Sequence, residues 1–310
     1  EAYERMIALV SLAEQRLAKN RKPAFPGARL PARPARLAEV APIIRGACSL
    51  PDSKSDGAWK RFVLDFRGGD AVMNFVNGTE VARYGQAGVV TPDHNIRIKN
   101  KPMVVAAPED GDLAGFRNAV RDAVAAYGET YKDYFSRNNT RVGGIKTMLD
   151  PSPRVVLVPG VGLFGLGRSK KDARVAADLA EAAIATITDA EAVGRFEPLP
   201  EADLFDVEYW SLEQAKLGGA RELPLAGQVV AITGAAGAIG FATAKAFAAA
   251  GAEVALLDVD ESAAQIKAME IGGAAVGLKC DVTDAAPVRE AFAQVASTFG
   301  GVDISISNAG

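Results

Sequence analysis

The chain has 310 residues, which suggests two domains, and its 49 % hydrophobic and 24 % charged residues are typical of a soluble globular protein. A net charge of −3 and an isoelectric point near 5.5 argue against nucleic acid or an anionic membrane as the main partner. Its only cysteines, Cys48 and Cys280, are too few for a disulfide framework and favour a reducing cytoplasm. The apolar stretch over 229–257 contains Lys245, Glu253 and many small residues, which argues against a membrane span.

The chain opens on a helical pattern within residues 1–20. The apolar positions of this pattern are Ile7, Val10, Ala13 and Leu17. Four prolines and several basic residues follow and predict an extended linker over 21–35. Because Glu1, rather than a methionine, begins the chain inside a helix, we expect a piece of a longer protein.

A domain of mixed α and β structure is predicted over 36–217. A stripe of apolar and aromatic residues predicts a long helix with its core face, at Leu113, Phe116, Val120, Val124, Tyr127, Tyr131 and Tyr134. The run 154–158 predicts a strand, and the glycines of 159–167 predict a turn after it. Ser169 and Asp172 then resemble a capping box that begins a helix ending near Val193.

The turn contains Gly160-x-Gly162-x-x-Gly165, which matches a dinucleotide-binding pattern. We reject it as a cofactor site, because no strand that ends in an acidic residue follows at the required distance. A turn that lets a strand and a helix pack closely is the favoured interpretation.

His94 is the only histidine of the chain, and it follows Asp93. A catalytic divalent metal needs about three protein ligands, often histidines, so no metal site is predicted. Asp93 and His94 could form a partial ligand or base pair, followed by a phosphate-attracting run at Arg97, Lys99 and Lys101. The favoured alternative is a turn at Pro92 and Asp93 followed by a solvated basic strand.

The C-terminal part alternates strands and helices. The run Val229–Thr233 predicts a buried strand, Gly234 to Gly240 predicts a phosphate-binding turn, and a helix is expected from Phe241 to Ala250. The next strand, 253–257, ends in Asp258, 18 residues past Gly240 and close to the roughly 20 expected for a ribose-binding acid. A carboxylate there accepts hydrogen bonds from the ribose and repels a 2′-phosphate, so NAD is the expected cofactor.

Further elements continue the alternation to the end of the chain. Helices are predicted at 261–269 and 285–299, and strands at 275–279 and 302–307. Repeated strand–helix–strand units predict a parallel sheet with right-handed crossovers.

Residues 225–310 resemble the short-chain dehydrogenase/reductase family. The motifs that carry the resemblance are Thr233-Gly234-x-x-x-Ala238-x-Gly240, Asp258, Cys280-Asp281-Val282 and Asn308-Ala309-Gly310. The resemblance implies that Gly234, Ala236, Gly237, Ile239 and Gly240 line the pyrophosphate, and that Thr233, which opens the motif, is also a cofactor-binding residue. It also implies that Asp281 and Val282 flank the adenine, and that Asn308, Ala309 and Gly310 border the cofactor ribose.

The same resemblance implies a catalytic serine and a Tyr-x-x-x-Lys motif beyond the Asn-Ala-Gly strand. No catalytic residue is predicted, because the chain contains no Tyr-x-x-x-Lys. Residues 225–310 are therefore expected to be the N-terminal half of a NAD-binding Rossmann domain, without oxidoreductase activity of their own.

Residues 154–181 resemble the class II sugar-phosphate aldolase fold. The family places a metal-binding histidine just before the Gly162-Leu163 pair, where this chain has Val161. The helix within 1–20 similarly resembles the closing helix of a truncated aldolase-like domain. The resemblance therefore implies that 36–217 is a degenerate aldolase-like α/β domain.

The order of the two resemblances is similar to bifunctional rhamnulose-phosphate aldolase/alcohol dehydrogenase proteins. It implies an α/β protein in deoxy-sugar catabolism that acts on a small aldehyde, alcohol or sugar phosphate. A homo-oligomer is also a candidate assembly. Two alternatives remain open, a non-catalytic nucleotide-binding or interaction protein and a stand-alone dehydrogenase with an unrelated scaffold domain.

Overall fold

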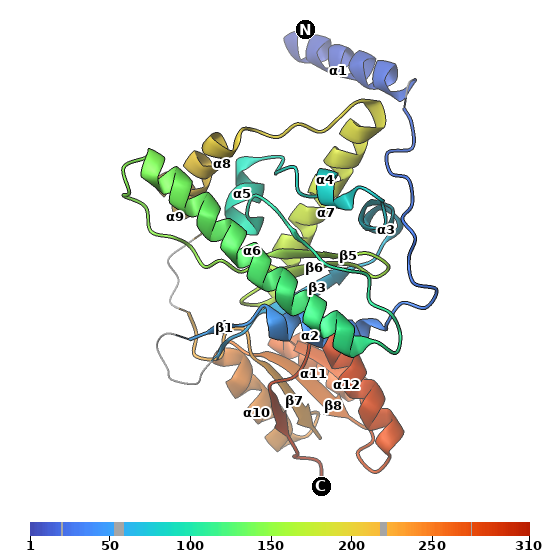
Figure 1. Ribbon diagram of the computed structural model, residues 1–310. Coiled ribbons are helices and arrows are strands. Elements are labelled where there is room, and N and C mark those ends of the chain that lie inside the picture. The colour runs from blue at the N-terminus through green and yellow to red at the C-terminus, as the bar shows by residue number, and fades with distance from the viewer. Residues whose placement is uncertain (20, 53–58, 218–221, 274) are drawn as a thin grey trace.

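The computed structural model describes residues 1–19, 21–52, 59–217, 222–273 and 275–310. In Figure 1 the chain runs from an N-terminal helix through a first α/β unit (35–217) to a second α/β unit (222–310) that holds the C-terminus. Each unit contains a four-stranded sheet. The predicted α/β class, with a Rossmann-type parallel sheet preceded by another α/β domain, is confirmed.

Helix α1 (Ala2–Ala18) extends away from both units and has no buried residue. The helix occurs where it was predicted, but Ile7 and Val10 on its apolar face are 45 % and 60 % exposed. Residue 20, at the end of the expected segment, lies outside the described residues.

Residues 21–35, which we call the strap, lie along the first unit instead of standing free of it. The Lys22 amide donates to the Ala192 carbonyl at 2.9 Å. Phe25 is buried, stacks on Tyr84 with ring centroids 4.0 Å apart and meets the edge of Phe75. The strap contains only isolated β-bridges at Gly27 and Pro34, and its aromatic residue belongs to the core.

The first sheet has the strand order β3-β6-β5-β4. Its strands are β3 (Val63–Arg67), β4 (Met103–Val104), β5 (Val155–Val158) and β6 (Gly162–Gly167). β4 and β5 are parallel and the other pairs are antiparallel. A separate pair is formed by β1 (Leu50–Pro51) and β2 (Trp59–Lys60).

The prediction of a glycine-rich turn over 159–167 was wrong, because only 159–161 turn and the rest is strand β6. A Cβ on Gly165 would lie 2.4 Å from the Ala173 carbonyl oxygen, and one on Gly167 would lie 2.2 Å from the Ala173 nitrogen. These glycines therefore let the next helix approach the strand closely, and they do not form a nucleotide-binding turn.

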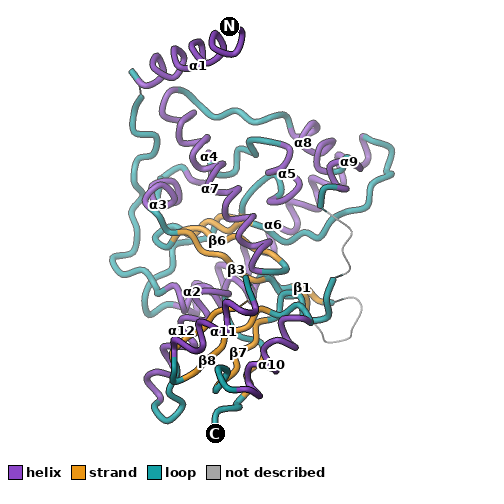
Figure 2. Tube along the Cα trace, turned by 180° about the vertical axis from the view of Figure 1, so that it is seen from behind, coloured by secondary structure: helices purple, strands orange, loops and turns teal. Residues whose placement is uncertain are grey.

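Helices cover both faces of this sheet (Figures 1 and 2). On one face α2 (Leu37–Ala47) and α6 (Leu113–Arg141) share a core with Val156 and Phe164. The other face packs on α3 (Asp70–Val76), α4 (Val81–Tyr84) and α7 (Lys170–Val193). α6 carries the predicted core stripe, and α7 begins at the predicted Ser169 cap. The Ser169 Oγ accepts from the Asp172 amide at 3.1 Å.

Residues 92–98 form helix α5 (Pro92–Ile98), so the prediction of a turn and a solvated basic strand here was wrong. Thr91 caps the helix and Pro92 occupies its first turn, a favourable start for a helix. Lys99, expected in solvent, is 4 % exposed. Two short helices, α8 (Glu201–Glu208) and α9 (Ser211–Ala215), complete the unit.

The second sheet is entirely parallel, with the order β10-β7-β8-β9. Its strands are β7 (Val229–Thr233), β8 (Glu253–Asp258), β9 (Ala275–Lys279) and β10 (Ile304–Ile306). Its helices are α10 (Ala238–Ala249), α11 (Glu261–Ile271) and α12 (Ala285–Phe299). α10 and α11 cover one face and α12 the other.

The two units share a buried boundary in which α12 packs on α2 and β3. Val63 of β3 belongs to the core beneath α12. Arg45 of α2 pairs with Asp303 of the second unit, and both side chains are less than a tenth exposed. The units therefore meet through apolar contacts and a buried ion pair.

Candidate functional site

A cavity of about 910 Å³ lies at the carboxyl ends of β7, β8, β9 and β10. In an open parallel sheet this edge, next to the strand where the order reverses, is where ligands bind. Here β7 is that strand, because β10 lies on one side of it and β8 on the other.

The turn after β7 is built for close approach of a ligand backbone. Gly234 has φ +61°, and a Cβ there would lie 2.9 Å from the Ala309 Cα. A Cβ on Gly240 would lie 2.5 Å from the Gly234 carbonyl oxygen. Gly237, the N-cap of α10, provides no side-chain hydrogen bond, so the first amides of α10 remain available to an anion such as a pyrophosphate.

Asn308 ties the turn to the end of β10. Its Nδ2 donates to the carbonyls of Thr233 and Gly234 at 3.0 and 3.2 Å. The Thr233 hydroxyl accepts from the amides of Asn308 and Ala309 at 3.0 and 3.2 Å. Thr233 thereby positions the segment without lining the cavity itself.

Asp258 stands at the end of β8, half-buried at the edge of the cavity. Its Oδ2 accepts from the Ala236 amide at 2.9 Å, and its Oδ1 accepts from the Asp260 amide at 3.1 Å. These contacts fix the carboxylate beside the glycine turn, where a ribose bound to the turn would meet it.

Asp281 follows β9 on the same edge. Its Oδ1 accepts from the Thr283 hydroxyl at 2.7 Å and from the Thr283 amide at 2.9 Å, and these bonds lower the pKa of the carboxyl group. The Cys280 amide donates to the Asp258 carbonyl at 2.7 Å, which ties the ends of β8 and β9 together.

The structure brings the sequence-predicted residues together around this one cavity, with Thr233 behind its wall. The predicted residues that line it are Gly234, Ala236, Gly237, Ile239, Gly240, Asp258, Asp281, Val282, Asn308, Ala309 and Gly310. The other lining residues, which were not predicted to bind the cofactor, are Ala238 and Cys280 within the motifs and Val259, Asp260, Ala263 and Thr283 outside them. Most of these directly adjoin a predicted residue, which is the signal that could have found them.

Three lining residues expose large apolar side chains to the cavity region. Ile239, Val259 and Val282 are 75 %, 65 % and 48 % exposed. Apolar side chains around a polar turn suit a ligand that has both a flat ring and a phosphate group.

Asp93 and His94 do not form a pair. Asp93 lies 3.7 Å from the Lys216 ammonium, whereas the Nδ1 of His94 is hydrogen bonded to the Thr91 hydroxyl at 2.7 Å. Burial lowers the pKa of His94. Within the described ranges, no three His, Cys, Asp or Glu side chains are grouped so that they could hold a metal ion.

Family models match both units. The model described as "Aldolase class II, second domain" matches residues 35–217, and the model described as "short chain dehydrogenase" matches 228–310. The chain is 34 % identical to an uncharacterized oxidoreductase, YuxG, of Bacillus subtilis (strain 168), over 99 % of this chain and 45 % of that protein.

Other similar proteins match the second unit alone. The D-threitol dehydrogenase of Mycolicibacterium smegmatis is 44 % identical over 28 % of this chain and 34 % of its own length. A solved 3-ketoacyl-(acyl-carrier-protein) reductase from Brucella melitensis, complexed with NADH, is 42 % identical over 26 % of this chain and 33 % of its own, with a TM-score of 0.25. The chain thus spans less than half the length of these relatives.

In the part of the chain that the structure describes, no helix could cross a membrane.

Proposed function

The chain belongs to the class II aldolase second-domain family over 35–217 and carries a short-chain dehydrogenase domain over 228–310, and from this we propose that it holds NAD for an oxidoreductase. The whole protein would transfer hydride between NAD and a small aldehyde or alcohol in deoxy-sugar catabolism. The protein would be cytoplasmic, and its two buried, unpaired cysteines support this proposal.

Asp258 carries the proposal of NAD rather than NADP. Its carboxylate is held against the glycine turn by the Ala236 amide. The 2′- and 3′-hydroxyls of a ribose would donate to it, whereas a 2′-phosphate would bring a second negative charge against it.

The remaining residues would hold the other parts of the cofactor. The amides at the start of α10 would face the pyrophosphate, and Val282 with Asp281 would flank the adenine. Asn308, Ala309 and Gly310 would border the second ribose. NAD supplies the hydride chemistry, and the residues of this chain bind and orient it.

The chain itself is proposed to bind the cofactor without turning it over. It has no Tyr-x-x-x-Lys motif, which in the related family supplies the acid and base. The aldolase-like unit has Val161 at the position of a metal-binding histidine. The sugar-phosphate chemistry is accordingly assigned to other parts of the whole protein.

The test is calorimetric titration of the purified chain with NAD⁺ and with NADP⁺. We expect NAD⁺ to bind at least about tenfold more tightly, a difference of about 1.4 kcal/mol. Asp258→Asn keeps an oxygen for the Ala236 amide but removes the charge, so it should reduce this preference. Asp258→Ala should weaken NAD⁺ binding as well.

Asp133→Ala, an exposed change on α6, is the matched control and should leave both affinities unchanged. Equal affinity of the wild-type chain for the two cofactors would contradict the assignment to NAD. Failure to bind either one would favour an interaction protein. An assay of the whole protein with a ketose phosphate and a divalent metal would separate the fusion from a stand-alone dehydrogenase.

A further inference from the structure

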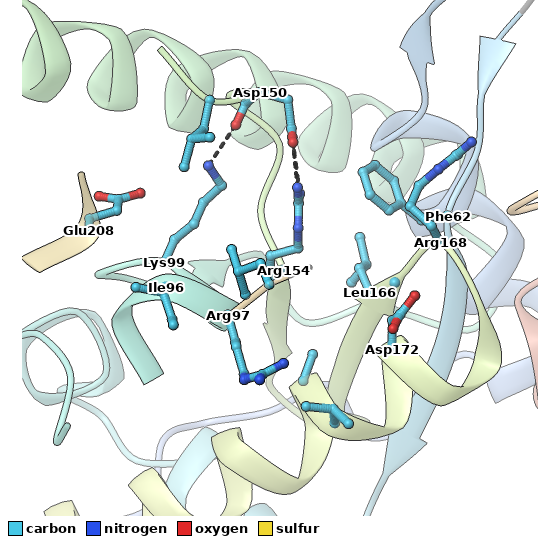
Figure 3. Close-up of a pocket in the computed structure, with 15 residues that line it drawn as sticks. Phe62, Ile96, Arg97, Lys99, Asp150, Arg154, Leu166, Arg168, Asp172 and Glu208 are labelled. Carbon is cyan, nitrogen blue, oxygen red and sulfur yellow. Dashed lines mark hydrogen bonds and ion pairs between the residues drawn. The ribbon is translucent and has the colours of Figure 1, made fainter. Parts of the chain in front are cut away.

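A second cavity, of about 300 Å³, lies in the first unit and shares no lining residue with the nucleotide cavity. We call it the Lys99 pocket (Figure 3). Its charged side chains include Arg97, Lys99, Asp150, Arg154, Arg168 and Glu208. Arg154 precedes β5 and Gly167 ends β6, so the pocket lies at the opposite end of this hairpin from Val161.

Lys99 is the central feature of the pocket. It is 4 % exposed, its Nζ donates to the Asp150 carbonyl at 2.6 Å, and it lies 3.7 Å from the centre of the Tyr131 ring. Among the described residues, no carboxylate lies within 4 Å of this ammonium group. An ammonium has three donors, so buried donors remain for a ligand.

The backbone at Lys99 is strained. With φ +63° and ψ 170° it is the one non-glycine residue with a positive φ in the described ranges. This region is essentially reserved for glycine and costs about 1–3 kcal/mol, and such residues cluster at functional sites. In this conformation Lys99 directly follows α5 and lines the pocket.

The nearby carboxylates already have partners. Asp150 accepts from Arg154 through both of its oxygens. Glu208 accepts from the hydroxyls of Tyr131 and Tyr134 at 2.7 and 2.9 Å, and burial raises its pKa. Neither carboxylate therefore forms a direct ion pair with the Lys99 ammonium, whose protein partners are the Asp150 carbonyl and the Tyr131 ring.

Arg97 adds to this positive charge. It is exposed on α5, one helical turn after Asp93, and its side chain has no hydrogen bond or ion pair to any described residue. In Figure 3 both Lys99 and Arg97 are among the side chains around the cavity. Two of the three residues in the possible phosphate-attracting run, Arg97 and Lys99, therefore line this cavity.

We propose that the Lys99 pocket binds a small hydroxylated organic anion, with Lys99 contacting its carboxylate or phosphate group. Arg97, whose side chain points away from Lys99 in Figure 3, would add positive charge on the other side of the cavity. The volume suits a molecule of a few carbons, and the oxygens of Glu208 and Asp150 can accept from its hydroxyls. The site is independent of the proposed cofactor site, since it lies wholly within the first unit.

The test is calorimetric titration of the 310-residue chain at pH 7 with three probes. Glycerol 3-phosphate and glycerate distinguish phosphate from carboxylate, and glycerol is the neutral control. We expect at least one anion to bind and glycerol not to bind. Lys99→Gly removes the ammonium but suits the backbone, so it should keep the melting temperature and weaken anion binding at least about tenfold.

Arg97→Gln should also weaken anion binding. Arg117→Gln, which changes an exposed arginine of α6 without a described partner, should leave anion binding unchanged. Weaker anion binding by Lys99→Gly and Arg97→Gln would also exclude the α10 amides as the binding site, because neither substitution changes the nucleotide cavity. Absence of anion binding, or Lys99→Gly binding as tightly as the wild type, would overturn the proposal.

The pH dependence is a further readout. Burial, with repulsion by Arg154, lowers the pKa of Lys99 to about 8, against the opposing influence of Asp150 and Glu208; the Tyr131 ring packs on the same ammonium. The protonated form binds the anion, so affinity should fall as the pH rises through about 8. Lys99→Gly should lose this dependence.

Discussion

Gly240 shows how a single missing Cβ shapes the nucleotide cavity. The space that its side chain would fill is already occupied by the Gly234 carbonyl, the Ala235 Cα and the Asn308 amide group, all within 2.8 Å of the Cβ position. The same Asn308 group holds that carbonyl by a hydrogen bond at 3.2 Å. The turn and the C-terminal segment therefore fit together only around a glycine.

Gly240→Ala should move the turn away from Asn308 and weaken NAD⁺ binding at least about tenfold, or about 1.4 kcal/mol. Titration calorimetry with the purified variant measures this. Gly46→Ala in α2 is the matched control, since nothing lies within 4 Å of its added Cβ, and it should bind NAD⁺ normally. An unchanged affinity in Gly240→Ala would show that the turn does not hold the cofactor.

The sequence predicts most of this cavity, because each motif stands at a fixed place relative to a strand end. Asp258 is found by its distance from the glycines, and Asn308 by its motif. The positioning role of Thr233 is not predictable in the same way. It depends on the amides of Asn308 and Ala309, 75 and 76 positions away, which only the folded sheet brings to its hydroxyl.

At the scale of elements, the strap adds an aromatic residue to a core that the rest of the first unit builds. Phe25, Phe75 and Tyr84 pack ring on ring. The Tyr84 hydroxyl donates to the Phe75 carbonyl at 2.5 Å, so this cluster also closes a polar contact.

Phe25→Ala should lower the free energy of unfolding by about 3–5 kcal/mol, because it leaves a cavity between the two other rings. Urea denaturation measures this loss. Tyr3→Ala, at a residue of α1 that is 71 % exposed, should change the free energy of unfolding by no more than about 0.5 kcal/mol. If Phe25→Ala and Tyr3→Ala lower the free energy of unfolding by the same amount, the strap does not belong to the core.

Prediction succeeded best for elements with a regular alternation. The bounds of β7, β9 and α12 agree with the predicted ranges, since apolar strands and capped helices there follow one another without interruption. It failed at 92–101 and 159–167. In the first range Lys99 is buried by the fold although its charge predicts exposure to solvent. In the second range the glycines lie in a strand and let a helix pack closely on it.

For the molecule as a whole, the boundary between the units depends on buried charge. Arg45 donates to the carbonyls of Phe62 and Gly227 at 2.6 and 2.9 Å as well as to Asp303. Asp303 also accepts from the Val229 amide at 2.8 Å. On the same boundary, Lys170 of α7 donates to the Thr298 carbonyl at 2.6 Å.

Asp303→Ala should cost about 3–5 kcal/mol, because it leaves the Arg45 charge buried without its partner. Scanning calorimetry should show both units melting together, earlier than in the wild type. Asp206→Ala removes an exposed ion pair with Arg141 and should cost at most about 1 kcal/mol. Earlier melting of only one unit would show that the boundary does not couple them.

The Arg45–Asp303 pair has a consequence for the synthesis of the protein. The two residues are separated by 258 positions, so a ribosome adding about 5–20 residues per second makes the arginine tens of seconds before its partner. During that interval α2 and Val63 have no α12 to pack against, and the first unit presents an unfinished face. A chaperone that recognises apolar surface next to positive charge would find its substrate there, and completion of β10 would end the interaction.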